Sequence, residues 1–378
     1  MRALALALLA TVSLHAADRA GLGRSFGHLK KTGSLTIGYF GGSITAGSGA
    51  SKPNETSYRA LTTKWFRDTF PGAKITEVNA AIGGTGSDLG AFRCQRDLLD
   101  NLPDLVFVEF AVNDGGANPE RIERSMEGIV RQIWRANPAA DIVFIYTTAK
   151  SLGTASYDKG EMPRAVLADE KIAVAYRIPS VNVGKALWQQ IHGGKYTWAD
   201  LLPDNTHPND TGYAIYTREI TAFLEAHRHD KRERPMKKLP APVSHAPLDN
   251  GHLIDGQTLG AAGWAPDTSR FKQGVAASEP GTRLDYKFEG NAIGVYWVIA
   301  PDSGDIEYSI DGSAPKRASS WDSYALRFTR TNYKIFEDAL PPGEHELALK
   351  ILPDHNPQST GTSIRIGALM VNPTSKSR

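Results

Sequence analysis

Four short polar segments of the chain hold the residue types that nucleophilic acyl transfer requires. That chemistry needs a hydroxyl beside a base, a group that orients the base, and hydrogen-bond donors where a carbonyl oxygen becomes negative. A serine, a glycine pair, an asparagine and an aspartate–histidine pair supply these parts in that chain order. The segments are residues 41–45, 79–87, 112–114 and 204–208.

The last segment offers the acid–base element. Asp204 lies three residues before His207 on a short loop, and a carboxylate at this spacing can fix the tautomer of the imidazole and support its positive charge. By itself the spacing is equally compatible with a metal pair or a surface turn. A metal-dependent phosphodiesterase would use Asp114 as a further metal ligand beside Asp204 and His207, but these three residues are few ligands for a metal site.

Each of the other segments is weak evidence when it is taken alone. Gly41 and Gly42 let the backbone turn sharply and expose Ser43, although Gly-Gly-Ser is also ordinary loop sequence. The glycine pair of the second segment lets a backbone N–H approach a ligand. Asn113, at the end of an apolar run, is also compatible with a simple turn cap.

The elements between these segments predict a parallel α/β sheet with helices on both faces. Parallel neighbours need crossover connections, and each polar segment falls between a strand and the next helix, at the carboxyl edge where ligands bind. Residues 105–112 are almost entirely apolar, which predicts a central strand. The expected strands are residues 35–40, 74–80, 105–112, 141–148 and 180–183, and the expected helices are residues 57–70, 87–99, 161–176 and those that start at Pro119 and Pro208.

The second half of the chain has a different pattern. The α/β pattern ends near residue 228, and residues 229–244 are charged and contain proline, which favours a solvated linker over a polyanion-binding patch. Residues 245–374 hold short β-rich runs separated by turn residues and predict an all-β sandwich. The runs are residues 283–288, 292–299, 305–310, 325–328, 345–351 and 363–371.

Composition narrows the classes of protein further. The chain has 378 residues, of which 41% are hydrophobic and 22% charged, and its formal net charge is +2. This balance gives no reason to expect a nucleic-acid partner. The single cysteine, Cys94, excludes an intramolecular disulfide and a zinc site built on several thiolates.

The N-terminus predicts export. Residues 1–17 combine an early positive charge, an apolar block at residues 3–14 and small residues near a plausible cleavage point, as in a secretory signal peptide. The alternative is a buried or frayed helix. The apolar block is shorter than the ~20 residues of a spanning helix, so we expect no stable membrane insertion and a periplasmic or extracellular location. The sequence holds no indication of an oligomeric state.

At this level of detail the chain resembles the SGNH, or GDSL-like, hydrolases over about residues 34–226. That family carries Ser, Gly, Asn and Asp-x-x-His blocks in this chain order. Two positions depart from the family pattern: Gly42 stands where an aspartate usually precedes the serine, and Ala111 where a glycine usually precedes the asparagine by two. The matching residues are Ser43, Gly84, Asn113, Asp204 and His207.

The resemblance implies a flavodoxin-like, three-layer α/β/α domain with five parallel strands. The Gly-Gly-Ser-Ile-Thr variant looks like that of exported esterases that act on carbohydrates, and the C-terminal half looks like the jelly-roll modules that accompany some of them. The predicted division is a signal peptide at 1–17, a catalytic domain at 25–228, a linker at 229–244 and a β-sandwich domain at 245–374.

The resemblance also implies roles for the matching residues. Ser43 would be the nucleophile, His207 its base and Asp204 the group that orients the base, with no cofactor or metal. The backbone N–H groups of Ser43 and Gly84 and the Asn113 amide would form the oxyanion hole. The expected substrate is an acetylated polysaccharide or oligosaccharide. The alternatives are a lipase or acyl-thioesterase of the same fold and an inactive carbohydrate-binding protein.

Three further residues are candidates for substrate contact. Tyr196 and Trp198 lie just before the Asp204 loop and could stack on a sugar ring, although ordinary packing under a loop is the favoured explanation. Arg93, on the helix after the second block, could reach a carboxylated sugar, but solvated helix faces carry such residues routinely.

Overall fold

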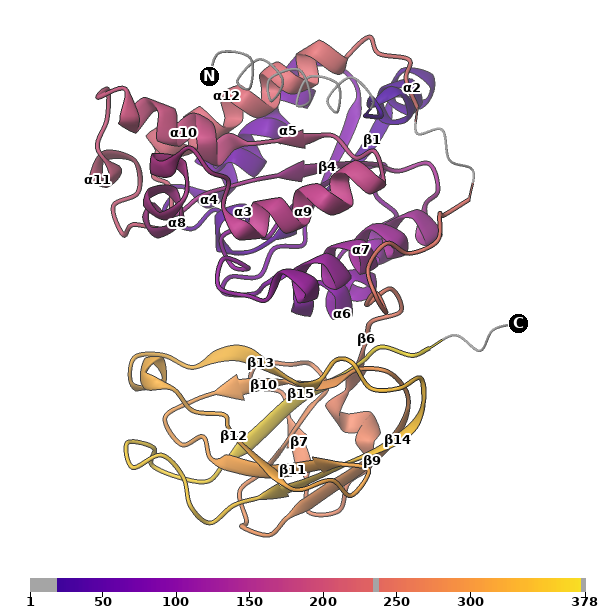
Figure 1. Ribbon diagram of the computed structural model, residues 1–378, viewed down its shortest axis with the longest axis vertical. Helices are drawn as coiled ribbons and strands as arrows, with labels where there is room; N and C mark the ends of the chain where they lie inside the picture. The colour runs from indigo at the N-terminus through magenta and orange to yellow at the C-terminus, as the bar shows by residue number, and fades with distance from the viewer. Residues whose placement is uncertain (1–18, 234–237, 375–378) are drawn as a thin grey trace, which may run out of the picture. The chain divides into compact units, whose positions relative to one another are not determined.

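The computed structural model describes residues 19–233 and 238–374, and the chain divides into two compact units, Met1–Asp249 and Asn250–Arg378 (Figure 1). The predicted signal peptide at residues 1–17 lies outside the described residues. No helix among the described residues is long and apolar enough to span a membrane.

The first unit is built on a sheet of five parallel strands in the order β2-β1-β3-β4-β5, which confirms the predicted flavodoxin-like fold. Every residue of β3 and β4 is buried, as expected of central strands that are covered on both faces. The strands are β1 (Ser34–Gly41), β2 (Lys74–Asn79), β3 (Leu105–Glu109), β4 (Asp141–Ile145) and β5 (Ser180–Val181).

Helices cover both faces of this sheet (Figure 1). On one face α6 packs against α7 and α7 against α9, while on the other α12 packs against both α5 and α10. The sequence analysis did not anticipate α2, α8, α10 or α11. The helices are α2 (Gly23–Thr32), α5 (Tyr58–Thr69), α6 (Ser87–Asp97), α7 (Pro119–Ala136), α8 (Lys150–Ala155), α9 (Arg164–Ala175), α10 (Val183–His192), α11 (Trp198–Leu201) and α12 (Asp210–His227), with short α3 (Ser43–Ala46) and α4 (Pro53–Thr56).

Local capping explains where the helices next to the site begin. The Ser57 side chain accepts the N–H of Ala60, so α5 starts one residue later, at Tyr58. The Asn209 side chain accepts the N–H of Gly212, and α12 therefore begins at Asp210 rather than at Pro208.

The segment after α12 packs on the first unit instead of remaining free in solvent. The Glu127 carboxylate of α7 accepts the N–H groups of Val243 and Ser244, at 2.8 and 2.7 Å. Leu248 is buried, and its carbonyl accepts a hydrogen bond from Gln132 Nε2 at 3.0 Å. The expectation of a solvated connector at 229–244 is therefore wrong for residues 243–244, because the Glu127 carboxylate of α7 holds them. Residues 245–248, assigned from the sequence to the β-sandwich, belong to the first unit.

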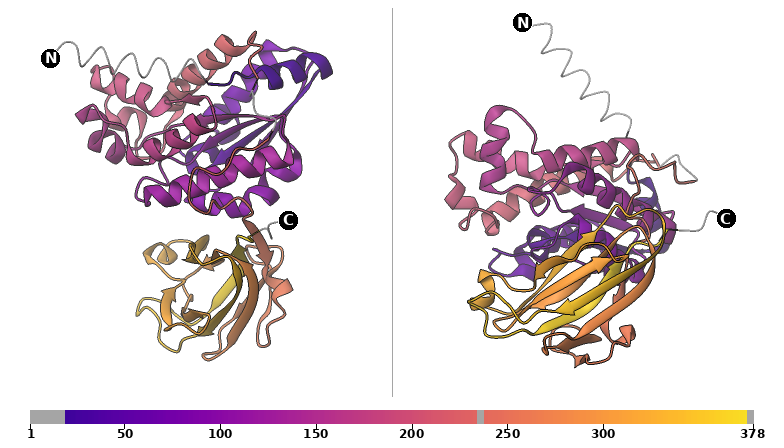
Figure 2. Two further views of the ribbon diagram at one scale, coloured as in Figure 1. Left: turned by 45° about the vertical axis from the view of Figure 1, so that its right-hand side comes forward. Right: turned by 60° about the horizontal axis from the view of Figure 1, so that its bottom comes forward.

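The second unit is a β sandwich of two antiparallel sheets, β13-β10-β15-β8-β7 with β6 on β15, and β12-β11-β14-β9 (Figure 2). Apolar residues from both sheets form one core. Residues 325–328, predicted as a strand, belong instead to a 3-10 turn, η4 (Ser323–Leu326), and the coil after it. The strands are β6 (His252–Asp255), β7 (Ala265–Asp267), β8 (Gly274–Ala277), β9 (Arg283–Gly290), β10 (Ile293–Ile299), β11 (Asp305–Ile310), β12 (Lys316–Ser319), β13 (Arg330–Glu337), β14 (Gly343–Ile351) and β15 (Ile364–Val371).

Candidate active site

The turn at the carboxyl end of β1 presents Ser43. Gly42 has extended backbone angles, and Ser43 is the first residue of α3. Gly41 has to be a glycine here, because a Cβ atom at this position would lie 2.4 Å from Thr45 Oγ1 and 2.5 Å from the Glu109 carbonyl oxygen. The close approach of β1, β3 and α3 therefore leaves Ser43 at the edge of the sheet.

The loop before α12 brings His207 and Asp204 to Ser43. His207 Nε2 lies 2.8 Å from Ser43 Oγ, and His207 Nδ1 lies 2.6 Å from Asp204 Oδ2. A carboxylate can only accept at Nδ1, so Nε2 is the nitrogen left to accept the serine proton. The fold thus brings Ser43 into contact with His207, although 164 positions separate the two residues in the sequence.

Backbone hydrogen bonds in the loop stabilise the ionised form of the Asp204 carboxyl group. Asp204 Oδ1 accepts the backbone N–H of Thr206 at 2.9 Å and of His207 at 2.7 Å. Between them Asn205 adopts a left-handed conformation, with φ of 66°, which asparagine tolerates better than most residues. Partial burial acts to raise the pKa of Asp204, but the hydrogen bonds from His207 and Thr206 outweigh it and lower that pKa below 3.8.

The second and third sequence blocks meet at the same turn. A Cβ atom on Gly83 would lie 3.5 Å from Ser43 Cβ, and Gly84 follows in a left-handed conformation with φ of 73°. Asn113 Oδ1 faces the Cα atom of Gly42. Within the described part of the chain the Asn113 side chain makes no hydrogen bond, so its amide is available to a ligand.

Asn113 lies very close to Gly42, the position at which the family pattern has an aspartate. A Cβ atom on residue 42 would lie 2.0 Å from Asn113 Oδ1, far inside van der Waals contact. Any larger residue at position 42 would therefore displace Asn113. Gly42 therefore leaves room for Asn113 beside the Ser43 turn.

Two of the three candidate substrate residues are half-buried and one is fully buried. Tyr196 and Trp198 pack against the core of the first unit, and the Trp198 indole lies so close to Gly153 of α8 that a Cβ there would be 2.4 Å away. Arg93 is 0% exposed, and its guanidinium donates to the carbonyls of Ala80 and Gly41 at 2.6 and 3.0 Å. This placement argues against a contact between Arg93 and a carboxylated sugar.

Asp114 does not join the aspartate–histidine pair. It is buried, and its Oδ1 accepts the backbone N–H of Ser87 at 3.0 Å. Burial, together with the negative charge of Asp88, raises its pKa to about 7. No group of three or more His, Cys, Asp or Glu side chains within residues 19–233 and 238–374 is arranged to hold a metal ion.

Several residues that hold the site together were not predicted from the sequence. Gly49 has φ of 87°, and a Cβ there would lie 2.9 Å from His207 Cβ. Tyr213 of α12 donates to the carbonyls of Ile44 and Ser48 at 3.0 and 2.7 Å. Nothing in the sequence pattern of the last helix distinguishes Tyr213 as a buried phenol that bonds to a distant turn.

The α/β unit has the fold and block arrangement of SGNH-type hydrolases. Residues 39–215 match the model of the GDSL-like lipase/acylhydrolase family. Comparison with curated proteins gave no match.

The whole chain is also similar to solved two-domain structures. One is a two-domain esterase (CEX) active on acetylated mannans, co-crystallised with mannopentaose, with 25% identity, a TM-score of 0.82, and coverage of 96% of this chain and 98% of that one. A second structure of a two-domain esterase (CEX) active on acetylated mannans gives 26% identity, a TM-score of 0.82, and coverage of 95% and 98%. Family and structural likeness together support an esterase.

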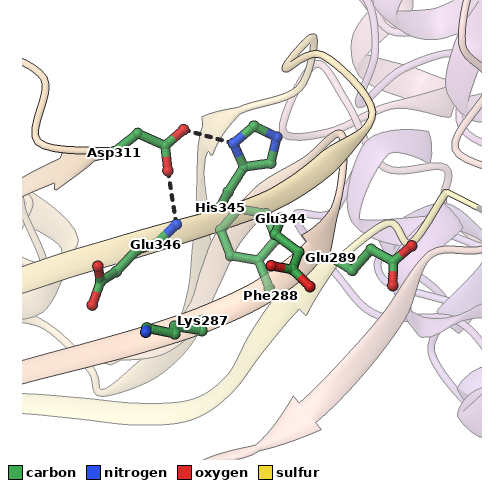
Figure 3. A pocket seen from close by; sticks show the side chains of 7 residues that line it. All are labelled: Lys287, Phe288, Glu289, Asp311, Glu344, His345 and Glu346. Carbon is green, nitrogen blue, oxygen red and sulfur yellow. Dashed lines mark hydrogen bonds and ion pairs between the residues drawn. The ribbon is translucent and has the colours of Figure 1, made fainter.

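A second aspartate–histidine pair lies in the β unit, at a hollow of about 430 Å³ (Figure 3). His345 Nδ1 lies 2.6 Å from Asp311 Oδ2, and His345 Nε2 lies 2.8 Å from the Pro341 carbonyl oxygen. The other lining residues are Lys287, Phe288, Glu289, Glu344 and Glu346.

Proposed function

We propose that this protein is an exported serine esterase that removes O-acetyl groups from a polysaccharide or oligosaccharide. The observation that carries the proposal is the 2.8 Å contact between His207 Nε2 and Ser43 Oγ, backed by Asp204 on the other ring nitrogen. This is the geometry in which an imidazole can take a proton from an attacking hydroxyl.

In the proposed first half-reaction, Ser43 Oγ attacks the acetyl carbonyl carbon while His207 Nε2 takes the hydroxyl proton. The carbonyl oxygen becomes an oxyanion, and the N–H groups of Ser43 and Gly84 and the Asn113 amide donate to it. When the tetrahedral intermediate collapses, the bond to the sugar oxygen breaks. The proton on His207 passes to that oxygen, which leaves acetyl-Ser43 and a free sugar hydroxyl.

The second half-reaction uses the same groups on water. His207 takes a proton from water as the water oxygen attacks the acetyl carbonyl of Ser43. Collapse of this intermediate returns the proton to Ser43 Oγ and releases acetic acid. Asp204 keeps Nδ1–H of the ring as a donor throughout and stabilises the transient imidazolium.

A carbohydrate ester is the substrate class that we favour over an acyl lipid or thioester. The full-length similarity to a two-domain esterase active on acetylated mannans supports this choice, because it includes the β unit. Half-buried Tyr196 and Trp198 remain candidates for stacking on a sugar. Acetate release from acetylated mannan and xylan, compared with hydrolysis of long-chain esters, tests it: greater activity on long chains would favour the lipase alternative.

Ser43→Ala tests the enzymatic role itself. We expect the variant to fold normally and to release no acetate above background from acetylated mannan. If the protein were an inactive carbohydrate-binding protein, the wild type itself would bind the polymer but release no acetate.

Export is the least direct part of the proposal and rests on the pattern of residues 1–17 alone. N-terminal sequencing of protein from the medium or periplasm should begin near residue 18. An intact Met1 on mature protein would contradict export by a cleaved signal peptide.

A further inference from the structure

Glu109 lies beneath the Ser43 turn, and the mechanism above gives it no role. It is the last residue of β3 and pairs in register with Gly41 of β1. The residue is 1% exposed. A buried carboxyl group destabilises the fold unless it is hydrogen-bonded. We therefore expect a carboxyl group at the end of a central strand to have hydrogen-bond partners and a function.

Two threonine hydroxyls bind the carboxyl group, one on each oxygen. Thr45 Oγ1 donates to Oε2 at 2.7 Å, and Thr147 Oγ1 donates to Oε1 at 2.6 Å. Tyr58 OH lies 2.7 Å from Thr45 Oγ1, which continues the chain of hydrogen bonds into α5. All three partners are 0% exposed, so solvent does not compete for these bonds.

The backbone of the nucleophile turn also acts on this carboxyl group. Burial raises the pKa of Glu109 above its usual value, and the hydroxyls of Thr147 and Thr45 and the amides of Gly42 and Thr45 offset this only in part. Those amides lie on either side of Ser43. The hydrogen bond from Thr45 Oγ1 ties the carboxyl group to one end of the short segment, residues 42–45, that carries the reacting hydroxyl.

We infer that Glu109 is a positioning residue whose carboxylate, held by Thr45 and Thr147, fixes residues 42–45 so that Ser43 Oγ stays within reach of His207. This inference rests on the proposed esterase function. Glu109 acts through the turn and does not touch the reacting atoms. A misplacement of about 1 Å at a reacting group can cost about 10²-fold in rate, which sets the size of the effect.

Glu109→Gln is the main test, because it keeps the shape and removes the charge. We expect kcat on a small aryl acetate to fall by about 10- to 100-fold while KM is unchanged. The rate of Ser43 labelling by a fluorophosphonate should fall by the same factor. The melting temperature should stay the same or rise, since removing a buried charge often stabilises a protein.

A merely structural role predicts a different set of results. In that case Glu109→Gln would lower the melting temperature and the fraction of folded protein. The kcat per labelled active site and the labelling rate of the folded fraction would both equal those of the wild type. That outcome would overturn the inference.

Asp141→Asn is the matched control at the opposite edge of the same sheet. Asp141 is the first residue of β4, is also buried, and accepts the backbone N–H of Ser25 at 2.8 Å. It undergoes the same chemical change from carboxyl to amide without contacting the Ser43 turn. We expect its kcat and labelling rate to be unchanged.

Thr147→Val keeps the inference testable if Glu109→Gln does not fold. It removes one donor to Glu109, and we expect kcat to fall by about 3- to 10-fold. Thr147→Ser restores the hydroxyl and should restore kcat. If wild-type Ser43 is not labelled at all, the proposed function fails and the inference with it; if the wild type is labelled and Thr147→Val matches it, only the role of Glu109 fails.

Discussion

The two aspartate–histidine pairs of this chain have nearly the same inner geometry. In both, Nδ1 lies 2.6 Å from an aspartate oxygen, and Nε2 lies 2.8 Å from a further oxygen. The difference is that this oxygen is the Ser43 hydroxyl in the α/β unit and the Pro341 carbonyl in the β unit. A hydroxyl can give up a proton, whereas a carbonyl can only accept one.

This difference decides what each histidine can do. His345 faces an acceptor on both sides, an arrangement that favours the protonated ring with both nitrogens as donors. Burial acts to lower the pKa of His345, but the hydrogen bonds to Asp311 and Pro341 outweigh it and raise that pKa above 6.5. His207 has one acceptor and one hydroxyl, which leaves Nε2 free to act as a base. An aspartate beside a histidine is therefore no evidence of catalysis until the second nitrogen's partner is known.

The largest expected effect separates the two histidines directly. His207→Ala removes the base, so we expect kcat for acetate release to fall by about 10⁴-fold or more. His345→Gln should leave kcat on a small aryl acetate unchanged. Steady-state kinetics on both purified variants provide the measurement. Equal losses in the two variants would contradict the distinction drawn here.

Asn113→Ala tests the donor that completes the site around the first pair. Loss of one oxyanion donor typically costs about 10²- to 10³-fold in turnover, and we expect a loss of that size with little change in KM. A change confined to KM would mean that Asn113 binds the substrate in its ground state instead.

Gly42→Ala tests the reason for the small residue before Ser43. The added Cβ must displace Asn113, so we expect kcat to fall by about 10- to 100-fold. In an Asn113→Ala background the same change should cost much less, because the displaced amide is already absent. Additive losses in the double variant would show that Gly42 acts independently of Asn113.

The smallest effect concerns the pH dependence of the second pair. A histidine whose pKa is raised on folding stabilises the fold fully below its unfolded pKa, about 6.5, and this contribution is lost as the pH rises through the folded value. The pKa of Asp311 is lowered by its hydrogen bonds to His345 and to the N–H of Glu346, so its contribution is lost only in acid below 3.8. Thermal melts should show a decline in stability as the pH rises above about 6.5, and His345→Gln should lack this decline. Parallel curves for the two proteins would contradict the assignment of His345 as a structural cation.

The parts of the fold that could be predicted are those that leave a pattern in a short stretch of sequence. The buried run of β3 and the polar blocks that follow the strands could be placed because apolar runs mark central strands and parallel strands end at one edge. The proximity of Ser43, Asp204 and His207 agrees with that topology, whereas the order of the strands was implied only by the resemblance to the SGNH hydrolases.

The parts that were not predictable depend on contacts between distant segments. Arg93 has the local pattern of a surface residue, yet it is buried because the carbonyls of Gly41 and Ala80 need a donor where two strands end. Glu109 lies within an apolar run, where nothing marks it as the partner of Thr45 and Thr147. Residues 325–328 have strand-like composition, but the Asp322 side chain caps a 3-10 turn that ends before β13.

The most direct test of the central claim is site-specific labelling by a fluorophosphonate, followed by peptide mass mapping and assay of residual activity. The account predicts a single adduct on Ser43, loss of acetate release in proportion to labelling, and much slower labelling of His207→Ala. Full acetate release from protein that is completely labelled at Ser43, or inactivation through a different residue, would contradict it.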